Sequence, residues 1–510
     1  MLMNADAHIS QRINKIIIVG GGTAGWMTAA TLAKVLGNEQ YSIQLIESEA
    51  IGTIGVGEAT IPHIGTFNKI LGIDEQDFMR STQATFKLGI EFTNWGNIGE
   101  SYIHPFGNYG MNIDSLHFYN YFLKMSKHES GLNPEDYSIG ALAARRNKFM
   151  HSLNDTRSPL GNIKYAYHFD AGLYARYLRS YAERNGVERI EGKITQVKLQ
   201  KDNGFIDSVL LEDGRVYNGE LFIDCSGFRG ILIEGALNTG YEDWSDLLPC
   251  DSAIAVPTAN RHPPVPYTRA TAHEAGWQWR IPLQHRTGNG HVYSSRFMGD
   301  DRAGQILLEN VEGELLAEPR VVRFKTGMRR KFWNKNCVAV GLSSGFLEPL
   351  ESTSIHLIQT SIKKLMEFFP DKQFNQTNID AYNEILQRNL LFIRDFIVLH
   401  YKVTNRSDSG FWNYCRTMPI PDSLEKRIAL YRQEGKIYHD SNELFSEDSW
   451  FAVMHGQGLV ASEYHPLADV VSQQQLKKFF SEIKMVTGNS ANAMPLHTDY
   501  LARYCAQSTS

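Results

Sequence analysis

Cysteine is scarce in this chain of 510 residues. The five cysteines are scattered, odd in number and free of C-x-x-C spacing, which argues against a disulfide framework and against a zinc site. No H-E-x-x-H motif occurs among the 17 histidines, so we expect no bound metal.

Strong charge and long apolar runs are also lacking. A net charge of −5 gives no electrostatic reason to expect nucleic acid or an anionic membrane as a partner. No stretch approaches the roughly 18 apolar residues that a membrane-spanning helix needs. The N-terminal segment lacks a cationic start, an apolar stretch and a small-residue cleavage site, so no secretory signal is expected. We therefore expect a cytoplasmic protein, whose length allows roughly two to four domains.

A β-α-β unit is predicted close to the N-terminus. The Ile-rich segment Lys15–Val19 has the pattern of a buried strand, and a glycine-rich turn leads from it into a helix that reaches Leu36. A second strand over residues 41–46 ends on Glu47, at the spacing where an acid binds ribose hydroxyls. This order of strand, turn, helix and strand is typical of adenine-dinucleotide binding.

Three glycines in the turn match the fingerprint G-x-G-x-x-G. Gly20 permits a tight turn, Gly22 lets the backbone approach a pyrophosphate, and Gly25 allows close helix packing. Thr23 and Ala24 lie at the predicted helix N-terminus, where amide groups and the helix dipole favour phosphate.

Later segments predict further strands and helices. Residues 190–230 are typical of a β-rich stretch ending in the apolar strand 221–224, and another strand is predicted over 337–340. Helical spacing of apolar residues begins at Ile355, and a long amphipathic helix is predicted over residues 379–401.

Three more segments carry candidate chemistry. They are Gly55-Val56-Gly57-Glu58-Ala59-Thr60 followed by Pro62, the hexapeptide Trp277-Gln278-Trp279-Arg280-Ile281-Pro282, and Glu348-Pro349-Leu350-Glu351-Ser352-Thr353. Taken singly, each has an ordinary interpretation: a glycine-rich turn, two tryptophans on one face of a strand, and an acid in the first turn of a helix.

Together with the glycine fingerprint, these segments resemble the flavin-dependent tryptophan halogenases over nearly the whole chain. The resemblance implies an α/β fold with a Rossmann-type FAD-binding module like that of p-hydroxybenzoate hydroxylase. A mostly helical module would cover the substrate. We expect the FAD-binding module over residues 1–360, with substrate-side segments inserted at about 80–165, and the helical module over 361–510, with interleaved boundaries.

The resemblance also implies a reaction. Reduced FAD would come from a separate NAD(P)H-dependent flavin reductase and react with O2 to a C4a-hydroperoxide. Bromide or chloride would attack this peroxide to give hypohalous acid, which travels through the protein to an electron-rich aromatic substrate. The family further suggests a homodimer.

Lys87, Glu351 and Ser352 match the family's catalytic positions. From the alternation of apolar residues alone, Lys87 would lie on the solvent face of a strand. The resemblance instead implies that its ammonium binds hypohalous acid or forms a haloamine. Glu351 would polarise the electrophile and stabilise the cationic ring, and Ser352 would hold the lysine.

Further residues match the family's flavin-binding positions. Trp277 and Trp279 would shield the flavin from the substrate. The glycine-rich segment that begins at Gly55 would contact the cofactor, as would two later positions. These residues are Gly55, Val56, Gly57, Glu58, Ala59, Gly341 and Leu350.

Thr353 and Ser354 match the halide-binding turn. Ser354 stands where the family usually has glycine, and a Cβ there would alter the pocket if the backbone is unusual. On this basis we expect a preference for bromide over chloride.

The substrate side resembles the family less closely. His104, Pro105 and Phe106 match the segment that holds an indole ring, whereas Trp450 and Phe451 stand where tryptophan-specific enzymes carry two tyrosines. An acid that reads the amino-acid head is replaced by glycine at 458, so the charged head would be buried unpaired. We therefore expect an indole-type arene rather than free tryptophan.

Two alternatives stay open at this point. An FAD-dependent aromatic hydroxylase explains the fingerprint but leaves the tryptophan hexapeptide and the Lys87/Glu351 pair without a role. A non-catalytic flavin-binding protein leaves the same pair unexplained.

Overall fold

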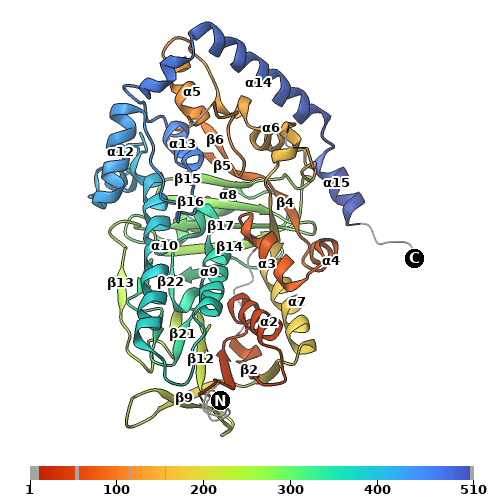
Figure 1. Cartoon of the computed structure of the whole chain (residues 1–510), viewed down its shortest axis with the longest axis vertical. Coiled ribbons are helices and arrows are strands. Elements are labelled where there is room, and N and C mark those ends of the chain that lie inside the picture. The colour runs from red at the N-terminus through yellow and green to blue at the C-terminus, as the bar shows by residue number, and fades with distance from the viewer. Residues whose placement is uncertain (1–10, 52–56, 114–115, 156, 506–510) are drawn as a thin grey trace, which may run out of the picture.

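The glycine fingerprint lies on a six-stranded sheet in a computed structural model that describes residues 11–51, 57–113, 116–155 and 157–505 (Figure 1). The strand order is β20-β21-β12-β1-β2-β8, and all neighbours except β20 and β21 pair in parallel. The strands are β1 Lys15–Val19, β2 Ser42–Glu47, β8 Glu188–Glu191, β12 Leu221–Asp224, β20 Trp333–Asn334 and β21 Cys337–Ala339.

The β-α-β unit has the predicted form. Strand β1 lies between β12 and β2, and its two faces pack into two different hydrophobic clusters, which explains its run of Ile and Val. Helix α2, Thr23–Leu36, follows directly and packs against α7, Ala171–Arg184. The predicted strand and helix ends at Val19 and Leu36 are confirmed, and β2 begins one residue later than expected, at Ser42.

A second, seven-stranded sheet carries the tryptophan hexapeptide on a central strand. Its order is β18-β14-β17-β16-β15-β5-β6. The bounds are β5 Gly89–Thr93, β6 Ser101–Pro105, β14 Ser252–Thr258, β15 Thr268–His273, β16 Gly276–Pro282, β17 Thr287–Tyr293 and β18 Arg320–Arg323.

Three small sheets complete the β structure. The predicted β-rich stretch forms β9 Ile194–Leu199, β10 Ile206–Leu211 and β11 Val216–Asn218. Another sheet comprises β13 Tyr241–Asp243, β19 Gly327–Arg329 and β22 Gly345–Phe346, and the third comprises β3 Gly57–Ala59, β4 Thr85–Lys87 and β7 Ala166–Asp170.

The strand is interrupted at Leu88, between β4 and β5, where the alternation of apolar residues predicted one continuous strand. Strand β4 pairs with β7 in a small sheet, whereas β5 pairs with β15 and β6 in the large one. Since both sheets are covered, Lys87 is fully buried, and its expected place on a solvent face is wrong.

Helices cover the sheets and account for the C-terminal part. Helix α9, Ser354–Glu367, and helix α10, Gln376–Lys402, follow the last strands, so the predicted helix over 379–401 is confirmed with longer ends. The remaining helices are α3 His63–Leu71, α4 Glu75–Ser81, α5 Phe118–Ser126, α6 Ile139–Arg145, α8 Asp300–Asn310, α11 Gly410–Thr417, α12 Asp422–Glu434, α13 Glu447–Gly456, α14 Gln473–Ala493 and α15 His497–Tyr504.

Segments far apart in the sequence meet at the end of the molecule opposite α2 and β2. Helix α14 packs against α5 and α6, and α13 packs against β6 (Figure 1). This contact brings residues of the 80–165 segment beside the C-terminal helices. The division into two modules near residue 360 stays a prediction. None of the helices in the described ranges is long and apolar enough to cross a membrane.

Candidate active site

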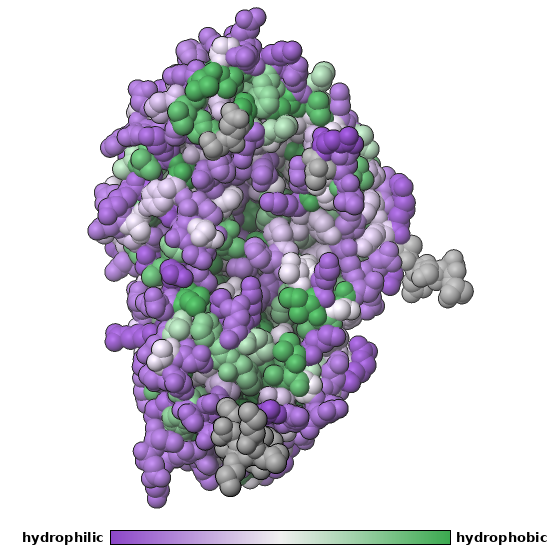
Figure 2. Space-filling view, viewed as in Figure 1, coloured by the Kyte–Doolittle hydropathy of each residue, from purple (hydrophilic) through white to green (hydrophobic). Residues whose placement is uncertain are grey.

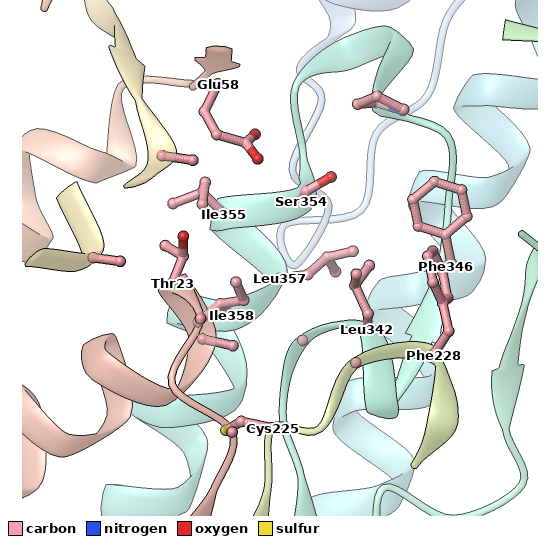
Figure 3. A pocket seen from close by; sticks show the side chains of 18 of the residues that line it. Thr23, Glu58, Cys225, Phe228, Leu342, Phe346, Ser354, Ile355, Leu357 and Ile358 are labelled. Carbon is pink, nitrogen blue, oxygen red and sulfur yellow. The ribbon is translucent and has the colours of Figure 1, made fainter. Parts of the chain in front are cut away.

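A cavity of about 790 Å³ opens beside the glycine turn. In Figure 3, Thr23 and Ile358 lie on one side of it and Phe228 and Phe346 on the other. Figure 2 shows apolar residues gathered on the lower half of the face, in the region that Figure 1 places around α2 and α9. A pocket of this size and lining suits a large, partly aromatic cofactor.

The glycine turn leaves room for a phosphate group. Gly20 has φ +110°, and a Cβ there would lie 2.3 Å from the carbonyl oxygen of Cys225. A Cβ on Gly25 would lie 1.8 Å from the carbonyl oxygen of Gly20, whereas one on Gly22 would meet open space. Since the first turn of α2 holds no acidic residue, the cradle fits the pyrophosphate of an adenine dinucleotide.

Except for Gly25, the expected flavin-binding residues that the structure describes line this cavity. Glu47 lines it at the end of β2, with its Oε1 accepting from Arg189 Nε at 2.5 Å. Gly55 and Val56 lie outside the described residues. The other lining residues among those expected are Gly20, Gly22, Thr23, Ala24, Gly57, Glu58, Ala59, Gly341 and Leu350. Burial raises the pKa of Glu58 to about 7.

Trp277 and Trp279 form part of the cavity wall. They lie two residues apart on β16, with ring centroids 6.2 Å apart. The indole Nε1 of Trp277 donates to Glu348 Oε2 at 2.7 Å. Trp279 lies over Gly290, where a Cβ would come within 2.1 Å of its ring. The wall is therefore held by a hydrogen bond at one tryptophan and by close packing at the other.

Lys87 is fully buried and points its ammonium at the turn before α9. Its Nζ donates to Ser352 Oγ at 2.7 Å and to the carbonyl oxygen of Thr60 at 3.0 Å, and it lies 5.0 Å from the ring centroid of Phe106. Burial lowers the pKa of Lys87 to about 7, although the nearby charge of Glu351 opposes that shift.

Glu351 is held between two histidines. His104 Nδ1 lies 3.0 Å from both carboxylate oxygens, and His400 Nε2 lies 2.8 Å from Oε1. Burial by itself would raise the pKa of Glu351, but the charge and hydrogen bonds of the two histidines outweigh it and lower the pKa to about 2. The carboxylate is therefore ionised throughout the neutral range.

His400 holds a proton against this carboxylate. Its Nδ1 faces the carbonyl oxygen of Phe396 at 2.8 Å, and its Nε2 faces Glu351. A carbonyl oxygen only accepts, so Nδ1 carries a hydrogen, and a second proton must lie between Nε2 and the carboxylate. This fully buried contact ties α10 to the turn that carries Glu351.

Ser352 connects the cavity with the lysine site. It lines the cavity and also accepts the hydrogen bond from Lys87. Its backbone has φ +60°, a left-handed conformation that is uncommon for serine. This conformation ends the short 3-10 turn Pro349–Glu351 and aims both Glu351 and Ser352 at the lysine side.

The expected halide turn lies at the start of α9. Thr353 precedes the helix, makes no side-chain cap, and has a buried Oγ1 without a hydrogen-bond partner within the described ranges. Ser354 is the first helical residue and has an ordinary negative φ. The expectation of bromide over chloride depended on an unusual backbone at Ser354. That condition is not met, so the argument loses its basis; the unusual backbone is at Ser352.

The substrate-side residues divide into two groups. His104, Pro105 and Phe106 lie at the end of β6, next to Glu351 and Lys87. Trp450 packs 5.0 Å from Phe396, whose ring stacks on Phe445 at 3.9 Å and lies 5.9 Å from His104. The ring of Phe396 therefore lies between Trp450 and His104, the histidine that contacts Glu351.

Phe451 lies in a different aromatic cluster. Its ring contacts Tyr109, Tyr119 and Phe122 at centroid distances of 5.6 to 5.7 Å. Trp450 and Phe451, which are adjacent on α13, thus pack into different aromatic clusters, because neighbouring residues on a helix point in different directions.

Glu348, Tyr401 and His400 were not predicted as site residues. Tyr401 donates to Glu348 Oε2 at 2.5 Å, and burial raises the pKa of Glu348 to about 7. The sequence signals were the place of Glu348 at the start of the motif 348–353, and a histidine and a tyrosine directly after the apolar run Phe396–Leu399 in a predicted helix. The function of such a pair can be inferred only once the structure shows its partners, Glu351 and Glu348.

The glycine cradle, the cavity and the tryptophan wall define a flavin-binding protein of the Rossmann type. Comparison with known proteins narrows the class: a family model described as tryptophan halogenase matches residues 15–473. The chain belongs to the tryptophan halogenase family. It is therefore a flavin-dependent halogenase, an enzyme that uses reduced FAD, O2 and halide to halogenate a small aromatic compound.

Solved and curated relatives cover almost the full chain. The flavin-dependent halogenase Xcc4156 from Xanthomonas campestris is 47% identical, with a TM-score of 0.94 over 98% of this chain and 100% of that one. The flavin-dependent halogenase BrvH from Brevundimonas sp. BAL3 is 44% identical, with a TM-score of 0.94 over 97% and 100%. The 7-chloro-L-tryptophan 6-halogenase KtzR from Kutzneria sp. (strain 744) is 35% identical over 96% of this chain and 99% of that one.

Proposed function

We propose that this halogenase acts on an uncharged, electron-rich arene of the indole type, at a site formed by Lys87 and Glu351. The observation that carries the proposal is the turn 349–354. One side of this turn lines the flavin cavity, and its other side presents Glu351 and Ser352 to the buried lysine.

When bound, reduced FAD would supply the electrons that reduce O2 to the oxidation level of peroxide, and that oxidant would turn halide into hypohalous acid. Lys87 then holds that acid by a charge-assisted hydrogen bond, in a site from which water is excluded. Ser352 and the Thr60 carbonyl oxygen fix the direction of the ammonium. Glu351 stabilises the positive charge that develops on the ring and accepts its proton, and His400 holds the carboxylate in place by a hydrogen bond.

The start of α9 is the proposed halide site. The helix N-terminus offers amide groups and a positive dipole end, and the buried Oγ1 of Thr353 is a further donor without a partner in the described ranges. Ser354, directly beside it, lines the flavin cavity, so a halide held there would lie next to the cofactor.

Charge pairing supports an uncharged substrate. Arg427 stacks on Trp450 at 4.6 Å but already forms an ion pair with Glu443. A substrate carboxylate would have to break this pair, and Gly458 offers no side chain to receive an ammonium group. The separate flavin reductase and the homodimer stay predictions that rest on the resemblance to the family, and the cytoplasmic location stays a prediction that rests on sequence composition.

The direct test is mass spectrometry of reactions that contain the purified protein, FAD, NADH, an added flavin reductase, O2 and bromide or chloride. Indole, tryptophan and several phenols serve as substrates. We expect a halogen isotope pattern that requires the reductase and is strongest for indole. An added oxygen atom without halogen would instead indicate a hydroxylase, and preferential halogenation of tryptophan would overturn the proposed substrate class.

A further inference from the structure

Trp277 differs from Trp279 in how it is held. Its Nε1–H donates to Glu348 Oε2 at 2.7 Å, whereas the buried Nε1 of Trp279 has no hydrogen-bond partner within the described ranges. Both rings line the same cavity. A specific polar contact therefore fixes one of the two rings that separate the flavin cavity from the rest of the molecule.

The acceptor of this hydrogen bond is an unusual residue for its surroundings. Glu348 is fully buried, and both of its donors, Trp277 and Tyr401, contact the same oxygen. The other oxygen, Oε1, has no hydrogen-bond partner among the residues described. Burying a carboxyl group with an unpaired oxygen carries a desolvation cost that an apolar side chain of similar size would not carry.

Glu348 also belongs to the catalytic turn. It immediately precedes the 3-10 turn Pro349–Glu351, so it lies three residues before Glu351. Two consecutive residues of α10 hold these two acids: Tyr401 donates to Glu348, and His400 contacts Glu351. The wall of the flavin cavity, the catalytic turn and α10 are thus joined at a single side chain.

We propose that Glu348 is a positioning residue that fixes the Trp277 indole against the flavin cavity and holds the 349–352 turn in place beside Lys87. This inference rests on the proposed function for its catalytic meaning. Without the hydrogen bond, packing alone sets the orientation of the buried ring, and the oxidant formed at the cofactor is less confined to the path toward Lys87. Hypohalous acid then escapes into solution before it reaches the arene.

The first experiment uses the apoprotein, so its result does not depend on turnover. Tryptophan is labelled with 15N in the indole, and the Nε1–H signals of Trp277 and Trp279 are assigned from Trp277→Phe and Trp279→Phe. We expect the Trp277 proton signal to move upfield in Glu348→Gln and further in Glu348→Ala, because the acceptor becomes weaker and is then lost. The Trp279 signal is the internal control. A Trp277 signal that does not move in either variant would overturn the inference.

The second experiment measures how much O2 consumption is converted into halogenated arene. We expect Glu348→Ala to lower this fraction by about tenfold, as misplaced groups near a reaction centre do, while FAD affinity stays close to that of the wild type. Glu348→Gln, which keeps the shape and one acceptor oxygen, should recover part of the loss and serves if the alanine variant does not fold.

The two experiments separate the two claims. If the wild type makes no halogenated product, the proposed function fails, but the apoprotein spectra still decide whether Glu348 holds Trp277. If the wild type halogenates and both Glu348 variants convert O2 into product as well as the wild type does, the positioning role is wrong.

Discussion

The ammonium of Lys87 is placed by three neighbours of different kinds. A serine hydroxyl and a backbone carbonyl accept its hydrogens, and an aromatic ring lies below it. Because the site is dry, the charge is only marginally stable there, and burial brings the pKa of Lys87 down to about 7. A group with these properties can bind an electrophile and can also change protonation state within the ordinary pH range.

Replacing this lysine separates flavin chemistry from ring halogenation. We expect Lys87→Met to lower product formation by at least about 100-fold, as loss of a catalytic proton donor does, while FAD binding is unchanged because Lys87 does not line the flavin cavity. Mass spectrometry measures the first and fluorescence titration with FAD the second. Near-normal yield of halogenated arene from this variant would refute the lysine assignment.

The pH dependence of the reaction reports which form of the lysine acts. Since the pKa of Lys87 is about 7 and that of Glu351 is about 2, only the lysine titrates between pH 6 and 9 among this pair. We expect the rate of ring halogenation to fall as the pH rises through about 7, because the ammonium is lost. Single-turnover rates with preloaded reduced FAD give this profile. A rate that instead rises over the same range would indicate that the neutral amine reacts, as in a haloamine.

Among the structural elements, the turn before α2 shows why spacing predicts so much. Each of its three glycines is required for a different structural reason. At two of them, an added Cβ would clash with the backbone of a neighbouring residue. Because these requirements are local in sequence, the strand, turn and helix could be predicted from the residues alone.

Two glycines of this turn should respond differently to alanine. We expect Gly25→Ala to lower the free energy of unfolding of the apoprotein by about 1–3 kcal/mol, because its Cβ would lie 1.8 Å from the Gly20 carbonyl oxygen. Gly22→Ala should leave apoprotein stability within about 0.5 kcal/mol, since its Cβ meets open space, but should weaken FAD binding. Denaturant unfolding and FAD titration measure the two effects. Equal loss of stability in both variants would contradict this division of roles.

The break at Leu88 shows where sequence reasoning ends. A period of two described the alternation of Phe86, Leu88 and Ile90, but it did not reveal that the strand changes sheets between them. Burial of Lys87 follows from that change, so the pattern alone gave the wrong environment. Only the family resemblance pointed to the lysine, because the acceptors of its ammonium lie on other segments of the chain.

His400 and Glu348 illustrate the same limit. Each owes its role to partners from elements far away in the sequence, and neither has a spacing that marks it. The parts of the site that could be predicted are short contiguous motifs. The parts that could not are contacts between elements.

At the scale of the whole molecule, the C-terminal helix α15 supports the strand that carries Lys87. His497, its first residue, accepts a hydrogen bond at Nε2 from the amide of Phe86 at 3.2 Å and donates from Nδ1 to the carbonyl oxygen of Pro264 at 2.8 Å. Burial lowers the pKa of His497 to about 4, so the ring is neutral at pH 7, in the tautomer these partners need.

Replacing His497 should therefore weaken the fold from a distance. We expect His497→Ala to lower the free energy of unfolding by about 2–4 kcal/mol, since two buried backbone groups lose their partner. Because the folded pKa of His497 lies below the usual value, its contribution is present above pH 6.5 and is lost as the pH falls toward 4. Denaturant unfolding at several pH values measures both effects. The exposed Lys477→Ala on α14 is the control, and equal stability of the two variants would contradict the prediction.

The reaction site draws each of its walls from a different stretch of chain: β4, the end of β6, the turn before α9, and α10. A library that randomises one short window therefore reshapes one wall and leaves the others as they were. Windows at the end of β6 therefore alter the arene side, whereas windows in the turn before α9 alter both sides, because that turn also lines the flavin cavity.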